Sequence, residues 1–221
     1  VLLLYLFGIL VLSHTKSLVS YVSLSLLVMF WAITFVWNVV CSLPHTLGAS
    51  SKVPGNPTCV CLGFVVFLVG FIIETLADVQ KWQFKQQGND TFCHVGLWAY
   101  SQHPNYFGDV LIVLGFYLLN VSSLVSSNAI SSSSSSSSWS SSLSFGLLWL
   151  QQNQGAILSL LAPIFTWMLL YGQAVGSITN ASSLARAKYG HDPKYALYES
   201  TVPLVIPNLF HKFNYHHPHE E

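Results

Sequence analysis

The chain has 221 residues, of which 52% are hydrophobic and 7% are charged, and its formal net charge is zero. Soluble domains carry about 25% charged residues, so this composition excludes an ordinary soluble domain and predicts an integral membrane protein. The zero net charge offers no electrostatic basis for binding nucleic acid. The four cysteines lack the paired spacing of a metal site, so we predict no metal and interpret them as apolar side chains.

Four apolar segments are candidates for membrane-spanning helices. They are residues 18–40, 59–77, 108–121 and 155–171. The third reaches spanning length if its helix starts near Pro104, and Pro163 is expected to kink the fourth. Residues 1–12 look like the end of a further span and lack the basic start of a signal peptide, so we expect an N-terminally truncated chain. The predicted fold class is an all-α integral membrane protein, a multi-span helical bundle.

Composition divides the chain into four parts. Residues 1–125 hold the first apolar segments and the polar loop between two of them. Residues 126–144 are mostly serine, show no apolar periodicity and are predicted to be a disordered loop. Residues 145–210 contain the last span and a polar C-terminal motif. Residues 211–221 are a His-rich polar tail, for which we favour a solvated tail over a weak metal site.

The basic residues predict how the protein is oriented. Successive crossings place Lys52 on one side of the membrane and the other seven Lys and Arg residues on the opposite side. By the positive-inside rule, the side with seven basic residues faces the cytosol. The polar loop before residue 104 and the segment from Gly176 onward are therefore both predicted to face the cytosol.

The second apolar segment ends in a charged stripe. Glu74, Asp78, Lys81 and Lys85 follow one another at helical spacings of four, three and four residues, so they share one helix face. Paired charges at a helix end account for the two lysines. They do not account for Glu74, because an ionisable residue inside a span costs about 2.5–3.5 kcal/mol on insertion scales. For Glu74 and Asp78 we favour a functional role or a buried polar network.

A polar motif, "GLWAYSQHPNYFGD", precedes the third apolar segment. Pro104 suits the first turn of a helix, which places Asn105 and Asp109 on one face. The free N–H groups at such a helix start can bind phosphate or carboxylate groups. The aromatic residues before His103 are interpreted as ordinary membrane-interface aromatics. The combination of His103, Pro104 and Asn105 with the following Tyr, Gly and Asp indicates a site.

A third polar group, "ARAKYGHDPKYALYESTVPLVIP", covers residues 185–207 and includes Arg186, Tyr189 and Tyr198. Taken alone, it is most simply a juxtamembrane tail held at lipid headgroups by its basic residues. The chain has neither a G-x-G-x-x-G motif after a strand nor a P-loop. Any cofactor site is therefore expected to be built by the membrane helices.

Three blocks resemble a known family when they are taken together. "IETLADVQKWQFK", "GLWAYSQHPNYFGD" and "KYGHDPKYALYESTVPLVIP" occur in the order found in the C-terminal part of the steroid 5-alpha-reductase superfamily. The most similar branch is its uncharacterised membrane group with the pattern ADxQK…GLWxxSRHPNYFGE. The resemblance implies a multi-span endoplasmic-reticulum membrane protein with a cytosol-facing pocket that takes NADPH from the cytosol. The hydride would go to an activated C=C bond of a steroid or other lipid.

The resemblance also implies roles for individual residues. Glu74 and Tyr106 are the candidate catalytic residues. The candidate cofactor-binding residues are Asp78, Lys81, Tyr100, His103, Asn105, Tyr106, Asp109, Arg186, Tyr189 and Tyr198. Two positions depart from the family: Gln102 stands where an arginine is usual, and "SITNASS" replaces an acidic residue before Arg186. Gln cannot supply the positive charge that an arginine would offer to phosphates.

Two other functions remain open from the sequence. An S-adenosylmethionine-dependent methyltransferase of the isoprenylcysteine type shares the His-Pro-x-Tyr element. That branch usually has a Glu-Glu pair near its last spans, and none occurs between Gly155 and Pro207, which favours the reductase. A non-catalytic protein that keeps the fold is the second alternative, because Gln102 and the missing acidic residue could lower cofactor affinity.

Overall fold

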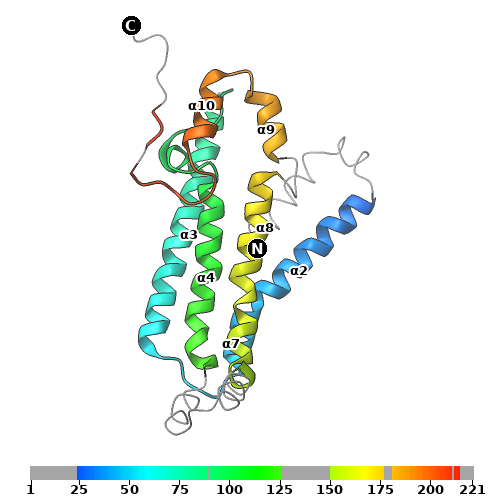
Figure 1. Cartoon of the computed structure of the whole chain (residues 1–221), viewed down its shortest axis with the longest axis vertical. Coiled ribbons are helices and arrows are strands. Elements are labelled where there is room, and N and C mark those ends of the chain that lie inside the picture. The colour runs from blue at the N-terminus through cyan, green and yellow to red at the C-terminus, as the bar shows by residue number, and fades with distance from the viewer. Residues whose placement is uncertain (1–23, 89, 126–149, 177–180, 211, 215–221) are drawn as a thin grey trace, which may run out of the picture. The chain divides into compact units, whose positions relative to one another are not determined.

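A computed structural model describes residues 24–88, 90–125, 150–176, 181–210 and 212–214 (Figure 1). In this part of the chain the secondary structure is helical and no strand occurs. Contacts divide the chain into two compact units, residues 1–39 and 40–221. The prediction of an all-α fold is confirmed.

Among the described residues, four helices are long and apolar enough to cross a membrane, and this confirms the prediction of an integral membrane protein. They are Trp31–Ser50, Pro57–Gln86, Pro104–Leu124 and Gln154–Val175. The predicted apolar end at 1–12 and the predicted disordered loop at 126–144 lie outside the described residues. So does most of the predicted tail at 211–221.

Helix α2 (Leu24–Ser50) contains the border between the two units. In the first unit its large apolar side chains, such as Trp31 and Phe35, are exposed. The predicted span ended at Val40, but the helix continues through Pro44 to Ser50. The helix is therefore longer than the apolar segment at this end, because neither Pro44 nor the polar residues near it terminate the helix.

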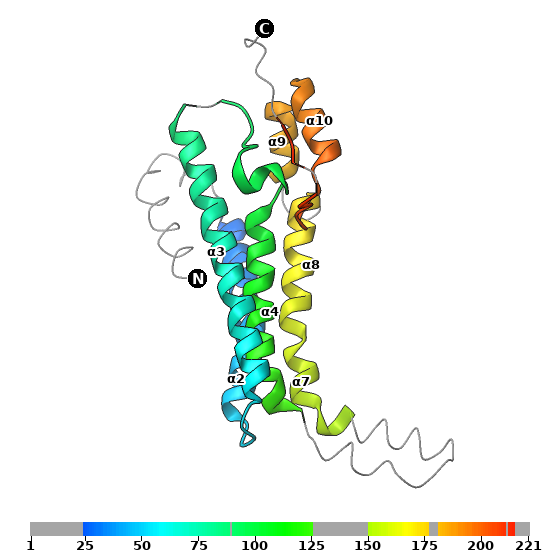
Figure 2. The ribbon, with the colours of Figure 1, turned by 90° about the vertical axis from the view of Figure 1, so that its left-hand side faces the viewer.

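Helices α3 (Pro57–Gln86) and α4 (Pro104–Leu124) form an antiparallel pair in the second unit (Figure 2). Asn56 caps α3, because its side-chain oxygen accepts hydrogen bonds from two backbone N–H groups of the first turn. Pro57 and Pro104 occupy the first turns, where a missing N–H costs nothing. The expected start of a helix at Pro104 is confirmed.

Glycines allow α3 and α4 to approach closely. Gly70 and Gly108 face each other across the pair, and a Cβ atom added to Gly108 would lie 2.6 Å from the backbone nitrogen of Glu74. Gly63 and Gly115 lie against the partner backbone in the same way, seven residues from Gly70 and Gly108 respectively. Small residues of this kind let two membrane helices pack backbone to backbone. The charged stripe on α3 is thereby held directly against the start of α4.

The fourth span consists of α7 (Gln154–Ser159) and α8 (Leu161–Val175), which pack against α4. The helix is interrupted at Leu160, three residues before Pro163. A proline has no N–H to donate to the carbonyl four residues earlier, so the expected irregularity near Pro163 is present. Gly176 ends α8 with a φ of 86°, a left-handed conformation that glycine adopts without strain.

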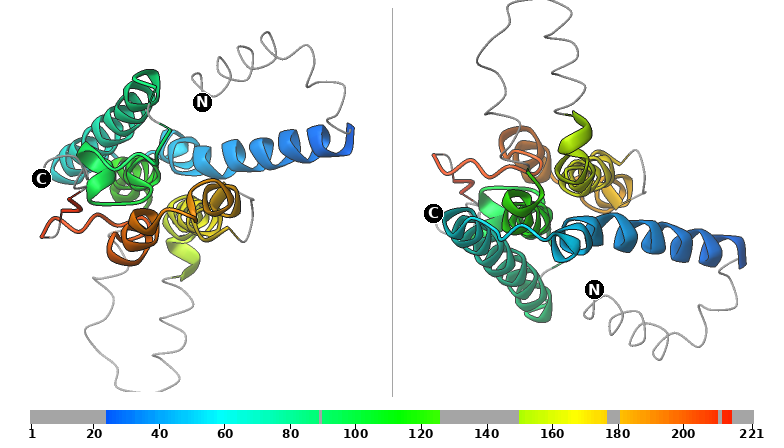
Figure 3. Two further views of the ribbon diagram at one scale, coloured as in Figure 1. Left: turned by 90° about the horizontal axis from the view of Figure 1, so that it is seen from above. Right: turned by 90° about the horizontal axis from the view of Figure 1, so that it is seen from below.

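The polar segments gather at one end of the second unit. They comprise the 3₁₀ helix η1 (Gly96–Ala99), α9 (Ala181–Tyr189) and α10 (Pro193–Thr201), at the top of Figure 1. The left view of Figure 3 looks down on this end. An aromatic cluster around Phe92, Tyr195 and Tyr198 forms the core there. Hydrogen bonds of Ser51 and Asn56 to the last turn of α4 hold the segment around Lys52 at the opposite end.

Candidate functional site

Polar side chains of α3 and α4 meet where the two helices cross. Nδ2 of Asn105 donates a hydrogen bond to Oδ1 of Asp78 at 3.1 Å. Asp109 lies close enough to Glu74 and Asp78 for their negative charges to repel one another. The predicted pairs Glu74/Asp78 and Asn105/Asp109 therefore face each other, and we call these four residues the acidic site.

The polar network at this site is incomplete at Asn105. Its Oδ1 atom is buried and has no hydrogen-bond partner among the residues that the structure describes. Leaving a buried acceptor unpaired costs about 1–3 kcal/mol. An acceptor in this position is suited to a donor from a bound molecule.

His103 and Tyr106 form the second part of the site, at the first turn of α4. Their rings stack with centroids 4.8 Å apart and an interplanar angle of 12°. The hydroxyl of Tyr106 donates to Oε1 of Gln173 on α8 at 3.5 Å. Burial, and then the nearby charge of Lys81, lowers the pKa of His103 to about 4, so this imidazole is neutral at pH 7.

Gln173 is a site residue that the sequence analysis missed. It lies in the last helical turns of the fourth span, where the surrounding sequence is apolar. A polar side chain inside a span often bonds to a neighbouring helix. That signal could have identified the residue, but nothing in the sequence could have identified Tyr106 as its partner.

Lys81 faces the segment that leads into α4. Its Nζ lies 4.5 Å from the centre of the Trp98 ring, a cation–π distance. The indole N–H of Trp98 donates to the carbonyl of Ala77 at 2.8 Å, and Gln80 accepts from the N–H of Leu97 at 2.9 Å. The interpretation of Trp98 as a membrane-interface aromatic is wrong, because its side chain is buried against α3.

Gln102 occupies the position where the family usually has arginine. Its Nε2 donates to the carbonyls of Glu199 and Val202, at 3.0 and 2.6 Å. These carbonyls belong to the end of α10, where helix carbonyls have no partner within the helix. The side chain thus ties the loop before α4 to the C-terminal segment.

The aromatic cluster around Phe92 includes three of the remaining predicted cofactor residues, Tyr100, Tyr189 and Tyr198. Tyr198 is buried and its hydroxyl donates to the carbonyl of Trp98 at 2.8 Å, while Tyr100 packs against the same aromatic cluster. Arg186 is exposed and forms an ion pair with Glu199 at 2.7 Å. The structure therefore does not join Tyr198 to Asn105 by a direct contact.

Tyr189 connects this group to the charged stripe. Its hydroxyl accepts a hydrogen bond from Nζ of Lys85 at 3.0 Å. Partial burial raises the pKa of Tyr189, but the hydrogen bonds and charges of Lys85 and Lys188 outweigh burial and lower the pKa overall. Lys85, Lys188 and Tyr189 thus gather positive charge and a polarised hydroxyl beside the end of α3.

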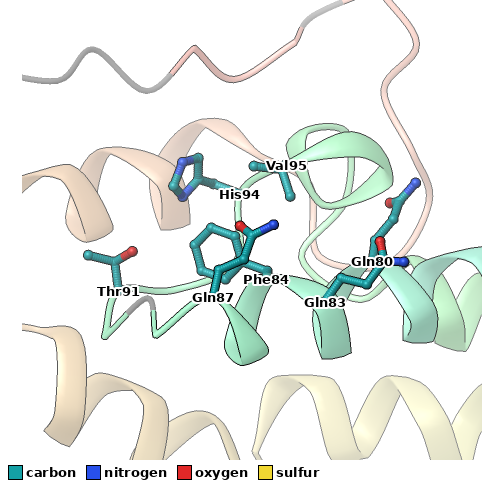
Figure 4. A pocket seen from close by; sticks show the side chains of 7 residues that line it. All are labelled: Gln80, Gln83, Phe84, Gln87, Thr91, His94 and Val95. Atoms are coloured by element: carbon teal, nitrogen blue, oxygen red, sulfur yellow. The ribbon is translucent and has the colours of Figure 1, made fainter.

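A separate polar hollow opens at the end of α3 (Figure 4). It is lined by Gln80, Gln83, Phe84, Gln87, Thr91, His94 and Val95. None of the residues predicted from the sequence lines it, and it is open and polar, unlike an enclosed cofactor pocket. Within the described ranges, no three His, Cys, Asp or Glu side chains are grouped to hold a metal ion.

Comparison with known proteins places the chain in a family. The family described as "Protein of unknown function (DUF1295)" matches residues 12–136, which include α2, α3, η1 and α4. An uncharacterized protein of Schizosaccharomyces pombe is 24% identical over 164 residues. That alignment covers 65% of this chain and 38% of the yeast protein, so the chain spans about two fifths of this relative's length. No solved structure matches the chain.

The family match covers more than half of the 221 residues and contains Glu74, Asp78, Asn105 and Asp109, the four residues of the acidic site. The chain therefore belongs to the DUF1295 family, which is associated with steroid 5-alpha-reductase-like proteins.

Proposed function

We propose that this protein is an NADPH-dependent membrane oxidoreductase that reduces an activated C=C bond of a steroid or other lipid, in the endoplasmic reticulum. The observation that carries the proposal is Oδ1 of Asn105 beside Asp78, a buried atom that has no hydrogen-bond partner in the described part of the chain. The proposal also rests on the resemblance of the three polar blocks to the reductase branch.

The polar groups of the site fit a nicotinamide cofactor. Oδ1 of Asn105 and the carboxylate of Asp78 are acceptors, as the carboxamide N–H groups and ribose hydroxyls of NADPH require. Lys81 and Lys85 supply positive charge on the same helix face for the phosphates. When bound, NADPH supplies a hydride to the substrate.

Tyr106 and Glu74 are the groups that we assign to proton handling. Gln173 accepts the Tyr106 hydroxyl hydrogen bond and so orients that proton within the helical bundle. Glu74 lies in the span, with Oε2 accepting from its neighbour Thr75 at 3.2 Å. Ionisable residues at membrane depth are expensive to keep, which favours a functional role for this carboxyl.

One of the predicted cofactor residues, Tyr198, receives a different role in this proposal. The hydroxyl of Tyr198 is used by the carbonyl of Trp98, so we assign Tyr198 to positioning the loop before α4. Arg186 is exposed in its ion pair with Glu199 and can exchange that partner for a phosphate. Asp109 remains assigned to the cofactor because it faces Asp78 and Glu74.

The proposal is tested by calorimetric titration of the protein in detergent with NADPH and, separately, with S-adenosylmethionine. Asn105→Ala should weaken NADPH binding by about 1–3 kcal/mol, since it leaves the ligand's buried donor unpaired. Asn120→Ala is the matched control, because Asn120 lies on the same helix and its side chain donates to the carbonyl of Phe116 one turn earlier in that helix.

Three results would contradict the proposal. If the Asn105 and Asn120 variants weakened NADPH binding equally, Asn105 would have no specific role in binding. Binding of S-adenosylmethionine in place of NADPH would indicate methyl transfer. Absence of binding for both ligands at millimolar concentration would support a non-catalytic protein.

A further inference from the structure

The C-terminal segment, residues 203–210 and 212–213, lies beside the loop that leads into α4. Four hydrogen bonds tie the segment to residues 99–102, at 2.8–3.0 Å. The bonded pairs are Gln102 with Pro203, Ser101 with Val205, Tyr100 with Asn208 and Ala99 with Phe213. The segment, red in Figure 1, is therefore held at a defined level of the helical bundle.

The segment has an inner and an outer apolar side. Val205 and Phe213 point inward and are only 3% and 6% exposed. Ile206 and Leu209 are 59% and 77% exposed, and Phe210 is fully exposed. Three large apolar side chains in neighbouring positions thus point away from the protein, although the bonds to residues 99–102 hold their backbone in place.

Hydrogen bonds between elements place this segment at the membrane surface. The bonds from Trp98 to Ala77 and from Asn105 to Asp78 bring the loop before α4 level with residues 77–78 of α3. Just beyond this level, α3 still exposes Trp82 at 63%. Exposed Trp side chains are typical of the headgroup region of a membrane.

The length of α4 also indicates that the C-terminal segment lies at the membrane surface. Its 21 residues span about 31 Å, close to the thickness of about 30 Å of a hydrocarbon core. Pro104 therefore lies at one edge of the hydrocarbon. The C-terminal segment is bonded to residues two to five positions before Pro104, which puts it in the headgroup layer.

We infer that Ile206, Leu209 and Phe210 insert into the boundary between headgroups and acyl chains, so that the C-terminal segment is a membrane-interface anchor. The occupant of this apolar side is phospholipid of the bilayer that α3 and α4 span. The exposed apolar surface of α3 reaches the level of these three side chains along the bundle. Lys212 follows the three residues and is exposed, as suits an anionic headgroup. This inference does not depend on the proposed reductase activity.

Spin labelling in phospholipid nanodiscs tests the inference. A label is placed at Phe210→Cys in full-length chain whose four natural cysteines are replaced by alanine. Oxygen, which concentrates in lipid, should relax this label more than a water-soluble nickel chelate does. Leu68→Cys on the exposed face of α3 should behave in the same way, and Asp90→Cys beyond α3 should show the opposite preference.

A second measurement avoids the cysteine replacements. The photoreactive residue p-benzoylphenylalanine is introduced at position 210 of the otherwise unchanged chain, and its adducts are identified by mass spectrometry. Phospholipid adducts would support the anchor. Nickel accessibility at 210 equal to that at 90, or adducts to a second copy of the chain in place of lipid, would overturn it.

Discussion

Gln102 and His103 are adjacent in sequence but serve different parts of the molecule. The amide of Gln102 reaches the last carbonyls of α10, while the ring of His103 stacks on Tyr106 at the start of α4. The backbone between them turns from loop to helix, which sends consecutive side chains in different directions. Each residue therefore has a separate measurable consequence.

Gln102→Ala should lower the free energy of unfolding by about 1–3 kcal/mol, because the carbonyls of Glu199 and Val202 lose their donor. Thermal unfolding in detergent measures the change. Gln102→Arg should retain stability, since arginine can donate to the same carbonyls and its charge suits a helix C-terminus. Gln83→Ala is the control at an exposed glutamine. A Gln102→Ala variant as stable as wild type would show that the bonds add nothing.

His103 should make stability depend on pH. Burial and the charge of Lys81 lower its pKa from 6.5 to about 4, so between these values the unfolded chain binds the proton and the folded protein does not. Stability is therefore fully present above pH 6.5 and falls as the pH drops to 4, by roughly 3 kcal/mol in total.

Chemical denaturation at pH 7 and pH 4.5 measures this loss. His103→Gln should lose less stability than wild type over that interval, because the titrating group is absent. His191→Gln is the control, since His191 is exposed. If both variants show the wild-type pH dependence, the buried imidazole is not its source.

At the scale of elements, the glycine contacts between α3 and α4 position the acidic site. A local spacing of four residues places Glu74 and Asp78 on one face of α3, and Asn105 and Asp109 on one face of α4. The two faces meet because Gly70 and Gly108 allow backbone contact between the helices. A larger residue in the contact would separate the polar pairs.

Gly108→Ala should destabilise the protein by about 1–3 kcal/mol, because the added Cβ would lie 2.6 Å from the backbone nitrogen of Glu74 and that backbone cannot move aside cheaply. Thermal unfolding in detergent is the measurement. Gly155→Ala is the control, since its Cβ would contact side-chain atoms of Leu124, the nearest at 3.3 Å, and no backbone atom is among the three nearest atoms within 4 Å. If Gly108→Ala were as stable as Gly155→Ala, the contact between α3 and α4 would not be tightly packed at Gly108.

At the scale of the whole molecule, Lys85 and Lys52 lie at opposite ends of the second unit. Lys85 contacts Tyr189 of α9, so the end of α3 and the segment after α8 lie together. Lys52 follows α2 at the other end, where Ser51 bonds to the last turn of α4. That the end with Lys85 faces the cytosol stays a prediction from the positive-inside rule.

Cysteine-accessibility labelling in sealed membranes should find positions 85 and 212 on one face and position 52 on the other. The physical reason is that an odd number of spans separates position 52 from position 85, whereas an even number separates 85 from 212. A reagent that cannot cross the membrane, applied from each side in turn, makes the measurement. Opposite faces for 85 and 212 would exclude the topology.

The sequence by itself determined the helical membrane class and which side chains share a helix face. Both follow from local properties: the scarcity of charge over long segments, and the helical spacing of Glu74, Asp78, Asn105 and Asp109. The start of α4 was equally predictable, because Pro104 is suited to only a few backbone positions.

Only the tertiary structure decided which faces meet. Tyr106 pairs with Gln173 and Gln102 with Val202, partners 67 and 100 positions apart in the chain. No local periodicity encodes such pairs, because they depend on which helices pack and at what height. The same limit explains the wrong interpretation of Trp98. An aromatic side chain suits a membrane interface and a buried position equally well, and the sequence does not show that the carbonyl of Ala77 accepts a hydrogen bond from its indole.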